Sequence, residues 1–191
     1  MKKRLFFATV IVICLSLLTS GTLAYFTTAD TARNVITTGG VDIEIVEQQL
    51  VGDQLKPFPD EPIRVMPATS VSKIVTVKSL EQTAWIRAKY TVTVYDPNKK
   101  VMDIPEEELN RVIVIEPDSK NWTYKNGWWY CNTAVGAGKE TAPLFETVAF
   151  SSPDMDNKYQ LCTVTVDVNA QAVQKANNGT TVQEANGWSE N

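Results

Sequence analysis

The stretch WIRAKYTVTVY, residues 85–95, alternates apolar and polar side chains over most of its length. Its apolar positions are Ile86, Ala88, Tyr90, Val92 and Val94, and its polar positions are Arg87, Lys89, Thr91 and Thr93. Successive side chains of a β-strand point to opposite faces, so a period of two predicts a half-buried strand. We therefore expect residues 85–95 to form a long strand with one face in the core.

Similar strand patterns recur along the chain after residue 40. Residues 160–168 alternate most clearly, with Cys162, Val164, Val166 and Val168 predicted to face inward. The other strand candidates are residues 41–45, 71–77, 112–115, 127–133 and 144–150. Turn-forming residues separate these stretches, and no long helices alternate with them. The pattern predicts an all-β sandwich or barrel.

Helical and irregular segments are short. Residues 105–110 begin with proline followed by three glutamates, which favours a short helical turn, and residues 170–176 are a second candidate. Residues 54–67 contain four prolines, and proline has no N–H to donate within a sheet. We expect them to form a surface connection. The polar residues 177–191 predict a flexible C-terminal tail.

The first 24 residues have the three parts of a secretory signal peptide. A basic cluster at residues 2–4 precedes an apolar run at residues 5–18, and small residues follow, with Thr22 and Ala24 at the positions that a signal peptidase reads. Cleavage is expected between Ala24 and Tyr25. The alternative is a retained membrane anchor, but the run is shorter than the roughly 20 residues that span a bilayer. We expect a secreted protein with no stable membrane insertion after cleavage.

Composition removes several function classes. The chain has no histidine, which excludes Ser-His-Asp triads and HExxH zinc sites. It also lacks a phosphate-binding glycine loop, so we expect no catalytic residue, cofactor or metal, and no enzyme. The formal net charge of −4 argues against nucleic acid as a partner.

Two cysteines remain after the signal segment, Cys131 and Cys162. An even number in a secreted chain permits one disulfide between them. The alternative is two buried thiols. The adjacent Trp128 and Trp129 must point to opposite faces of a strand, so we expect one in the core and the other near the surface.

The front of the chain, SGTLAYFTTADTARNVITTGGVDIEI at residues 20–45, resembles that of secreted proteins processed by a SipW-type signal peptidase. Further matches are GWWY at residues 127–130, GKET at residues 138–141 and AQAVQ at residues 170–174. In this combination the chain is similar to the TasA/camelysin family of Gram-positive bacteria. The resemblance implies a jelly-roll-like antiparallel β-sandwich, here residues 41–176, with short helical turns.

The resemblance also implies a function. Members of this family are secreted proteins of the biofilm matrix or cell surface that form fibres. Some have been labelled metalloproteases, a label that a chain without histidine or a zinc motif does not support. The implied partners are other copies of the chain, related matrix subunits, and the signal peptidase during export.

The resemblance further suggests that the N-terminal segment, residues 25–40, is a donor strand that adds to the next subunit. We take residues 25–36 as the donor, with Tyr25, Phe26, Val35 and Ile36 as its candidate anchors. Strand addition supplies main-chain hydrogen bonds, and contact between unlike surfaces produces an open filament. The alternative for the segment is an intramolecular strand or a disordered leader. The alternatives for the protein are a monomeric surface-binding or adhesin module and a camelysin-like protease.

Overall fold

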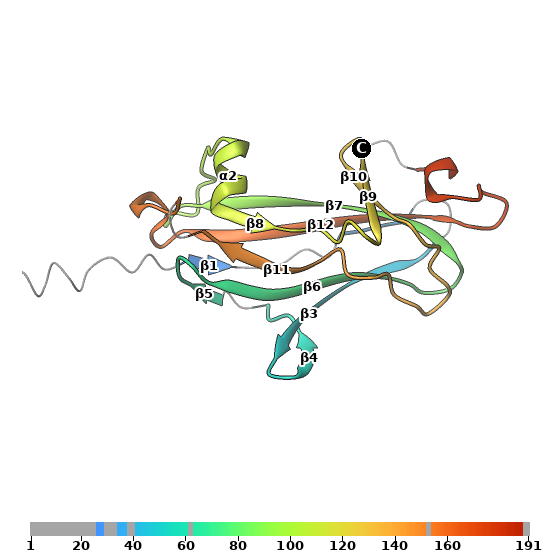
Figure 1. Cartoon of the computed structure of the whole chain (residues 1–191), viewed down its shortest axis with the longest axis horizontal. Coiled ribbons are helices and arrows are strands. Elements are labelled where there is room, and N and C mark those ends of the chain that lie inside the picture. The colour runs from blue at the N-terminus through green and yellow to red at the C-terminus, as the bar shows by residue number, and fades with distance from the viewer. Residues whose placement is uncertain (1–25, 29–33, 38–40, 61–62, 152–153, 189–191) are drawn as a thin grey trace, which may run out of the picture.

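The computed structural model describes residues 26–28, 34–37, 41–60, 63–151 and 154–188. Within them the strands form two separate sheets that pack face to face as a sandwich, with one short α-helix, α2 (Glu106–Val112). Figure 1 shows β7 and β12 in one layer and β3 and β6 in the other. The prediction of an all-β, jelly-roll-like sandwich with short helical turns is confirmed.

The first sheet has seven strands in the order β5-β1-β12-β7-β10-β9, with β2 also paired to β12. Their bounds are β1 (Phe26–Thr28), β2 (Asn34–Thr37), β5 (Ile63–Val65), β7 (Ala84–Tyr95), β9 (Trp122–Lys125), β10 (Trp128–Cys131) and β12 (Thr163–Gln174). The second sheet has five strands in the order β4-β3-β6-β11-β8. Their bounds are β3 (Ile43–Val51), β4 (Gln54–Pro57), β6 (Ser70–Ser79), β8 (Ile113–Ile115) and β11 (Phe145–Phe150).

Strands β7 and β12 form the longest pairing in the molecule. Their antiparallel register runs without interruption from Ala84 opposite Gln174 to Tyr95 opposite Thr163. The alternation expected from the sequence holds: Val164, Val166 and Val168 are buried in the core between the sheets. Buried side chains of the second sheet complete this core, namely Ile43, Val75, Val77, Phe145, Val148 and Phe150.

Two segments expected to be irregular belong to the sheets instead. Residues 170–174 continue β12 rather than forming a helical turn. The proline-rich residues 54–67 contribute β4 and β5, each at the end of its sheet's strand order. A strand at an edge pairs on one side only, which is why proline is tolerated at the end of β4.

The C-terminal segment packs on the outer face of the first sheet as far as Trp188, so the prediction of a flexible tail is wrong for residues 177–188. They contain a short 3-10 helix, η2 (Val182–Glu184), and Val182 is almost fully buried beside Trp85 and Trp128. The guanidinium of Arg87 lies 4.3 Å from the Trp128 ring and 4.7 Å from the Trp188 ring. This stacking joins the segment to the sheet.

The side chains of the two adjacent tryptophans point to opposite faces of the sheet, as predicted, but the expectation that one lies near the surface is wrong for Trp128, which is 6 % exposed. Trp128 lies in the cluster on the outer face, whereas Trp129 packs, partly buried, against the core between the sheets.

Cys131 and Cys162 are free, buried thiols and not the disulfide that their even number permitted. Cys131 follows Tyr130, which pairs with Arg87, whereas Cys162 precedes Thr163, which pairs with Tyr95. The two sites are thus separated along β7 by about 26 Å, at roughly 3.3 Å per residue. A disulfide requires Cα atoms about 4.4–6.8 Å apart. Burial raises the pKa of both thiols.

A buried ion pair lies in the second sheet. The Lys73 ammonium is 2.9 Å from a Glu47 carboxylate oxygen and 4.2 Å from the centre of the Phe58 ring. The Lys73 side chain is 1 % exposed and the Glu47 side chain 15 % exposed. Loss of one member of such a pair leaves the other charge in a poorly solvated place.

We expect Lys73→Met to lower the free energy of unfolding by about 3–5 kcal/mol, because it leaves the Glu47 carboxylate without its ammonium partner. The double variant Lys73→Met/Glu47→Leu should recover most of that loss. Lys100→Met, at an exposed position, is the control and should change stability by less than about 0.5 kcal/mol. Urea unfolding measures all three. A Lys73→Met protein as stable as the parent would show that the pair contributes little.

Candidate assembly site on strand β12

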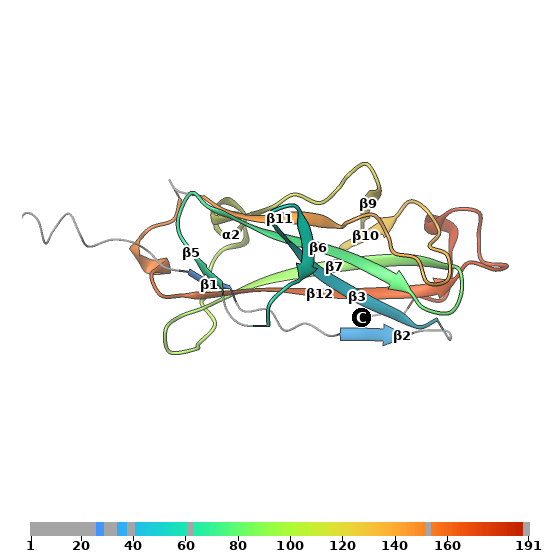
Figure 2. The same ribbon diagram turned by 90° about the horizontal axis from the view of Figure 1, so that it is seen from below.

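Strand β12 has two edges, and each edge pairs with different strands. One edge pairs with β7 over all twelve residues of β12. The other edge pairs with β1 and β2, the two strands of the N-terminal segment. Figure 2 shows β2 lying at the flank of the sandwich near the C-terminal part of β12.

The N-terminal segment runs parallel to β12, whereas every other strand pair in the described residues is antiparallel. Thr27 lies opposite Thr163, and Asn34 lies opposite Asn169. Between these two pairings the segment advances seven positions and β12 advances six. The two short strands therefore follow β12 in the same direction and nearly the same register.

The candidate anchors of the donor strand divide between these strands. Phe26 is in β1, opposite Val65 of β5. Val35 and Ile36 are in β2, opposite Ala170 and Gln171. Ala24 and Tyr25, the expected cleavage site, lie outside the described residues. Within one chain the segment thus forms an intramolecular strand, which is one of the alternatives left open by the sequence.

The part of β12 that receives β2 is deeply buried. Ala170, Gln171 and Ala172 are each fully buried, and they belong to the four residues that pair with β2. A buried backbone N–H or C=O without a hydrogen-bond partner costs free energy comparable to a lost bond. β2 therefore supplies the hydrogen-bond partners that this edge of β12 needs while it is covered.

The prediction of a helical turn at residues 170–176, which begin with AQAVQ, is the reason that the sequence analysis does not identify this edge. The signal was present, since the period of two in residues 162–168 continues through Ala170 and Ala172. No pattern in the sequence predicted that the Gln171 side chain is buried. Its amide oxygen accepts two hydrogen bonds from the Arg87 guanidinium, at 2.7 and 3.0 Å.

A polar cluster fastens α2 to the segment that leads into β12. The Tyr159 hydroxyl, in η1 (Asn157–Tyr159), donates a hydrogen bond to the Glu108 carboxylate, which also pairs with the Lys158 ammonium. The bonds from Lys158 and Tyr159 lower the pKa of Glu108. Burial, followed by the bond to Glu108, raises the pKa of Tyr159.

The described part of the chain shows neither a metal-binding cluster nor a membrane-spanning helix. No three His, Cys, Asp or Glu side chains there are grouped so that they could hold a metal ion. None of its helices is long and apolar enough to cross a membrane.

The cluster at Glu108 predicts a pH dependence. A carboxyl whose pKa is lowered by folding stabilises the protein above its unfolded pKa, and the effect is lost as the pH falls through the folded pKa. The free energy of unfolding should therefore fall between about pH 5 and pH 3, and Glu108→Gln should reduce this fall. Glu106→Gln, on the exposed face of the same helix, is the control. An unchanged slope in Glu108→Gln would contradict the assignment.

No protein-family model matches the chain, and comparisons with characterised proteins and with solved structures give no match.

Proposed function

We propose that the chain is a secreted structural protein of the extracellular matrix that assembles into fibres by exchanging its N-terminal segment. In this proposal residues 26–37 of one copy leave their own β12 and pair with β12 of the next copy. The observation that carries the proposal is the parallel pairing of β1 and β2 with the buried edge of β12.

Exchange would preserve the pairings that the single chain already makes. A segment that moves to a second copy forms the same contacts there, so its release and its capture nearly balance in free energy. The segment joins the second sheet at β3 through residues 38–42, which include Gly39 and Gly40.

The donor and the acceptor are different surfaces. The donor of each copy is its N-terminal segment, and the acceptor of each copy is the edge of its β12. Contacts between unlike surfaces that do not close into a ring continue as an open filament. The expected fibre is therefore polar, with a free segment at one end and a bare β12 edge at the other.

The sequence supports an extracellular setting for this assembly. The first 24 residues resemble a signal peptide, so the segment would be released only at export. The resemblance to the TasA/camelysin family points to a biofilm matrix or cell surface and to partners that are further copies or related subunits. We propose no enzymatic activity, since a chain without histidine lacks the motifs of a camelysin-like protease.

The second candidate is a monomeric secreted binding or adhesin module. One observation favours it: the segment already fills the β12 edge of its own chain. A chain whose own N-terminal segment pairs with β12 does not require a strand from a second copy.

Deleting residues 25–36 separates the two candidates. A chain that begins at Tyr25 should form filaments visible by negative-stain electron microscopy, and the truncated chain should not, because its β12 edge lacks a donor. A synthetic peptide of residues 25–36, added in excess, should shorten the filaments by capping the acceptor edge. The matched control is the same peptide with Val35→Asp and Ile36→Asp.

Filaments of normal length and rate from the truncated chain would refute strand exchange. Monomers from both chains at every concentration would favour the adhesin module.

A further inference from the structure

Strand β7 has an open edge on the side away from β12. On that side β10 pairs only with Arg87 and Ala88, and the next bridge joins Tyr95 to Val101. Residues 89–93 between these points have no strand beside them in the described part of the chain. At about 3.3 Å per residue the gap is about 16 Å long.

The backbone hydrogen bonds at the two ends of β7 show which residues direct their N–H and C=O groups to this gap. Ala84 exchanges two bonds of 2.9 Å with Val135, and the Val94 carbonyl accepts a bond of 2.8 Å from the Met102 N–H. On the opposite side, the Thr83 carbonyl accepts from the Lys175 N–H, at the end of β12. Even-numbered residues of β7 therefore point their N–H and C=O groups away from β12.

The register between β7 and β12 has no interruption, so this alternation holds along the whole strand. Tyr90 and Val92 thus direct two N–H and two C=O groups into the gap. None of these four groups has a hydrogen-bond partner among the described residues. Such groups are a ready template for an added strand.

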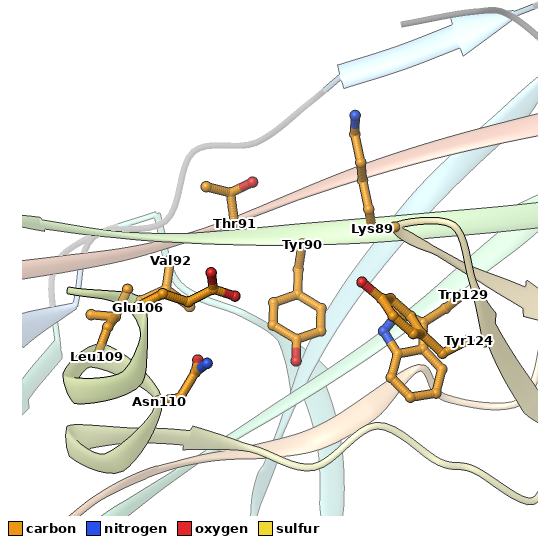
Figure 3. A pocket seen from close by; sticks show the side chains of 10 residues that line it. Lys89, Tyr90, Thr91, Val92, Glu106, Leu109, Asn110, Tyr124 and Trp129 are labelled. Atoms are coloured by element: carbon orange, nitrogen blue, oxygen red, sulfur yellow. The ribbon is translucent and has the colours of Figure 1, made fainter. Parts of the chain in front are cut away.

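A groove of about 440 Å³ lies along this gap. Residues of α2 line one end and residues of the β9–β10 hairpin line the other (Figure 3). Figure 3 shows Tyr90 pointing into the space between them, and Lys89 and Thr91 pointing to the other side of β7. The lining side chains include Leu109, Asn110, Tyr124 and Trp129.

The groove has an apolar floor and a polar rim. Tyr90 packs on Phe145 of the second sheet, with ring centres 5.4 Å apart, and Trp129 and Leu109 are partly buried against the core. Tyr124 stands over Trp129, with ring centres 5.1 Å apart, although the Tyr124 side chain is 60 % exposed. An exposed aromatic ring above a half-buried one suits a surface that gains cover on binding.

Two of the end strands of the sheets, β4 and β5, have proline beside or within them. The edge strand β4 ends at Pro57, and β5 lies between Pro62 and Pro67 in the sequence. Proline has no N–H to offer an incoming strand. Residues 89–93, Lys-Tyr-Thr-Val-Thr, contain no proline and favour the strand conformation.

We propose that this groove binds a short extended peptide of a partner protein, which adds to β7 at Tyr90 and Val92 as a further strand. This site lies on the opposite edge of β7 from β12, so it does not depend on exchange of the N-terminal segment. The proposed peptide is about five residues long and alternates apolar and polar side chains, because side chains alternate along a strand.

The surroundings define which side chains fit. Apolar side chains of the peptide face Leu109 and Trp129 on the inner side of the sheet. Polar side chains face the side of Lys89 and Thr91. The Lys89 ammonium lies 4.5 Å from the centre of the Trp128 ring, on the outer face, and favours an acidic residue there.

The test is amide hydrogen exchange by NMR, with the peptide Thr-Val-Glu-Val-Thr, acetylated and amidated, as the probe. In the free protein the N–H groups of Tyr90 and Val92 should exchange rapidly, and the peptide should slow them at least about tenfold. Those of Thr91 and Thr93 point toward β12 and should be slow throughout, which gives an internal control.

Slow exchange at Tyr90 and Val92 in the free protein would overturn the proposal, since the edge would already be covered. Protection by a cello-oligosaccharide but not by the peptide would also overturn it and assign the groove to carbohydrate.

Two variants, Val92→Pro and Asn110→Trp, test the same point, and a third, Thr91→Pro, is the control. Val92→Pro removes an N–H that has no partner in the free protein, so the protein should still fold. The peptide should no longer slow the exchange of the Tyr90 N–H in this variant. Thr91→Pro removes an N–H directed to β12 and should destabilise the fold far more. Asn110→Trp fills the groove from α2 without changing β7 and should weaken peptide binding at least about tenfold. Binding by either Val92→Pro or Asn110→Trp at the level of the parent would contradict the proposal.

Discussion

The antiparallel pairing of β7 with β12 is the interaction on which the rest of the molecule depends. These two strands run side by side for twelve residues each, and their inner side chains form one wall of the core. The N-terminal segment lies on the far edge of β12, and the β9–β10 hairpin and the groove lie on the far edge of β7. The C-terminal segment covers the outer face of both strands, where Trp85 and Val173 pack with Val182 and Arg87 lies on the Trp188 ring.

A single constraint links the two proposals, namely that backbone N–H and C=O groups need partners when they are removed from water. At β12 the edge is covered by the N-terminal segment, which supplies its hydrogen-bond partners within the chain. At β7 the N–H and C=O groups of Tyr90 and Val92 face a groove, where water can form hydrogen bonds with them until a peptide binds. The first proposal therefore concerns exchange of a strand that the edge already has, and the second concerns addition of a strand that the edge lacks.

Much of the fold could be predicted from the sequence, because it follows from side-chain alternation. Residues 85–95 and 163–168 form strands with the predicted inner faces, and the glutamates after Pro105 begin α2. The continuation of β12 through residues 170–174 was missed because Ala and Gln have weak strand propensity, and pairing on both sides overrides it. The prolines at residues 54–67 concealed two short edge strands for a similar reason.

The sites were harder to predict because they depend on contacts between residues distant in the sequence. Nothing near Cys131 or Cys162 shows that they lie at opposite ends of β7. The polar C-terminal sequence gave no indication that Trp188 stacks on Arg87, about 100 residues earlier. The gap at residues 89–93 arises only because β10 is short.

The central claim is that the β12 edge is filled by the segment of another copy in the filament. The most direct measurement uses a chain beginning at Tyr25 with Asn34→Cys and Asn169→Cys, in a background with Cys131→Ala and Cys162→Ala. These two positions lie opposite each other, and adjacent strands are about 4.8 Å apart, within the range of a disulfide. Oxidation of assembled filaments should give a ladder of covalent multimers on a non-reducing gel, and oxidation of dilute monomers should give only monomers. Filaments that yield only internally bonded monomers would contradict the account.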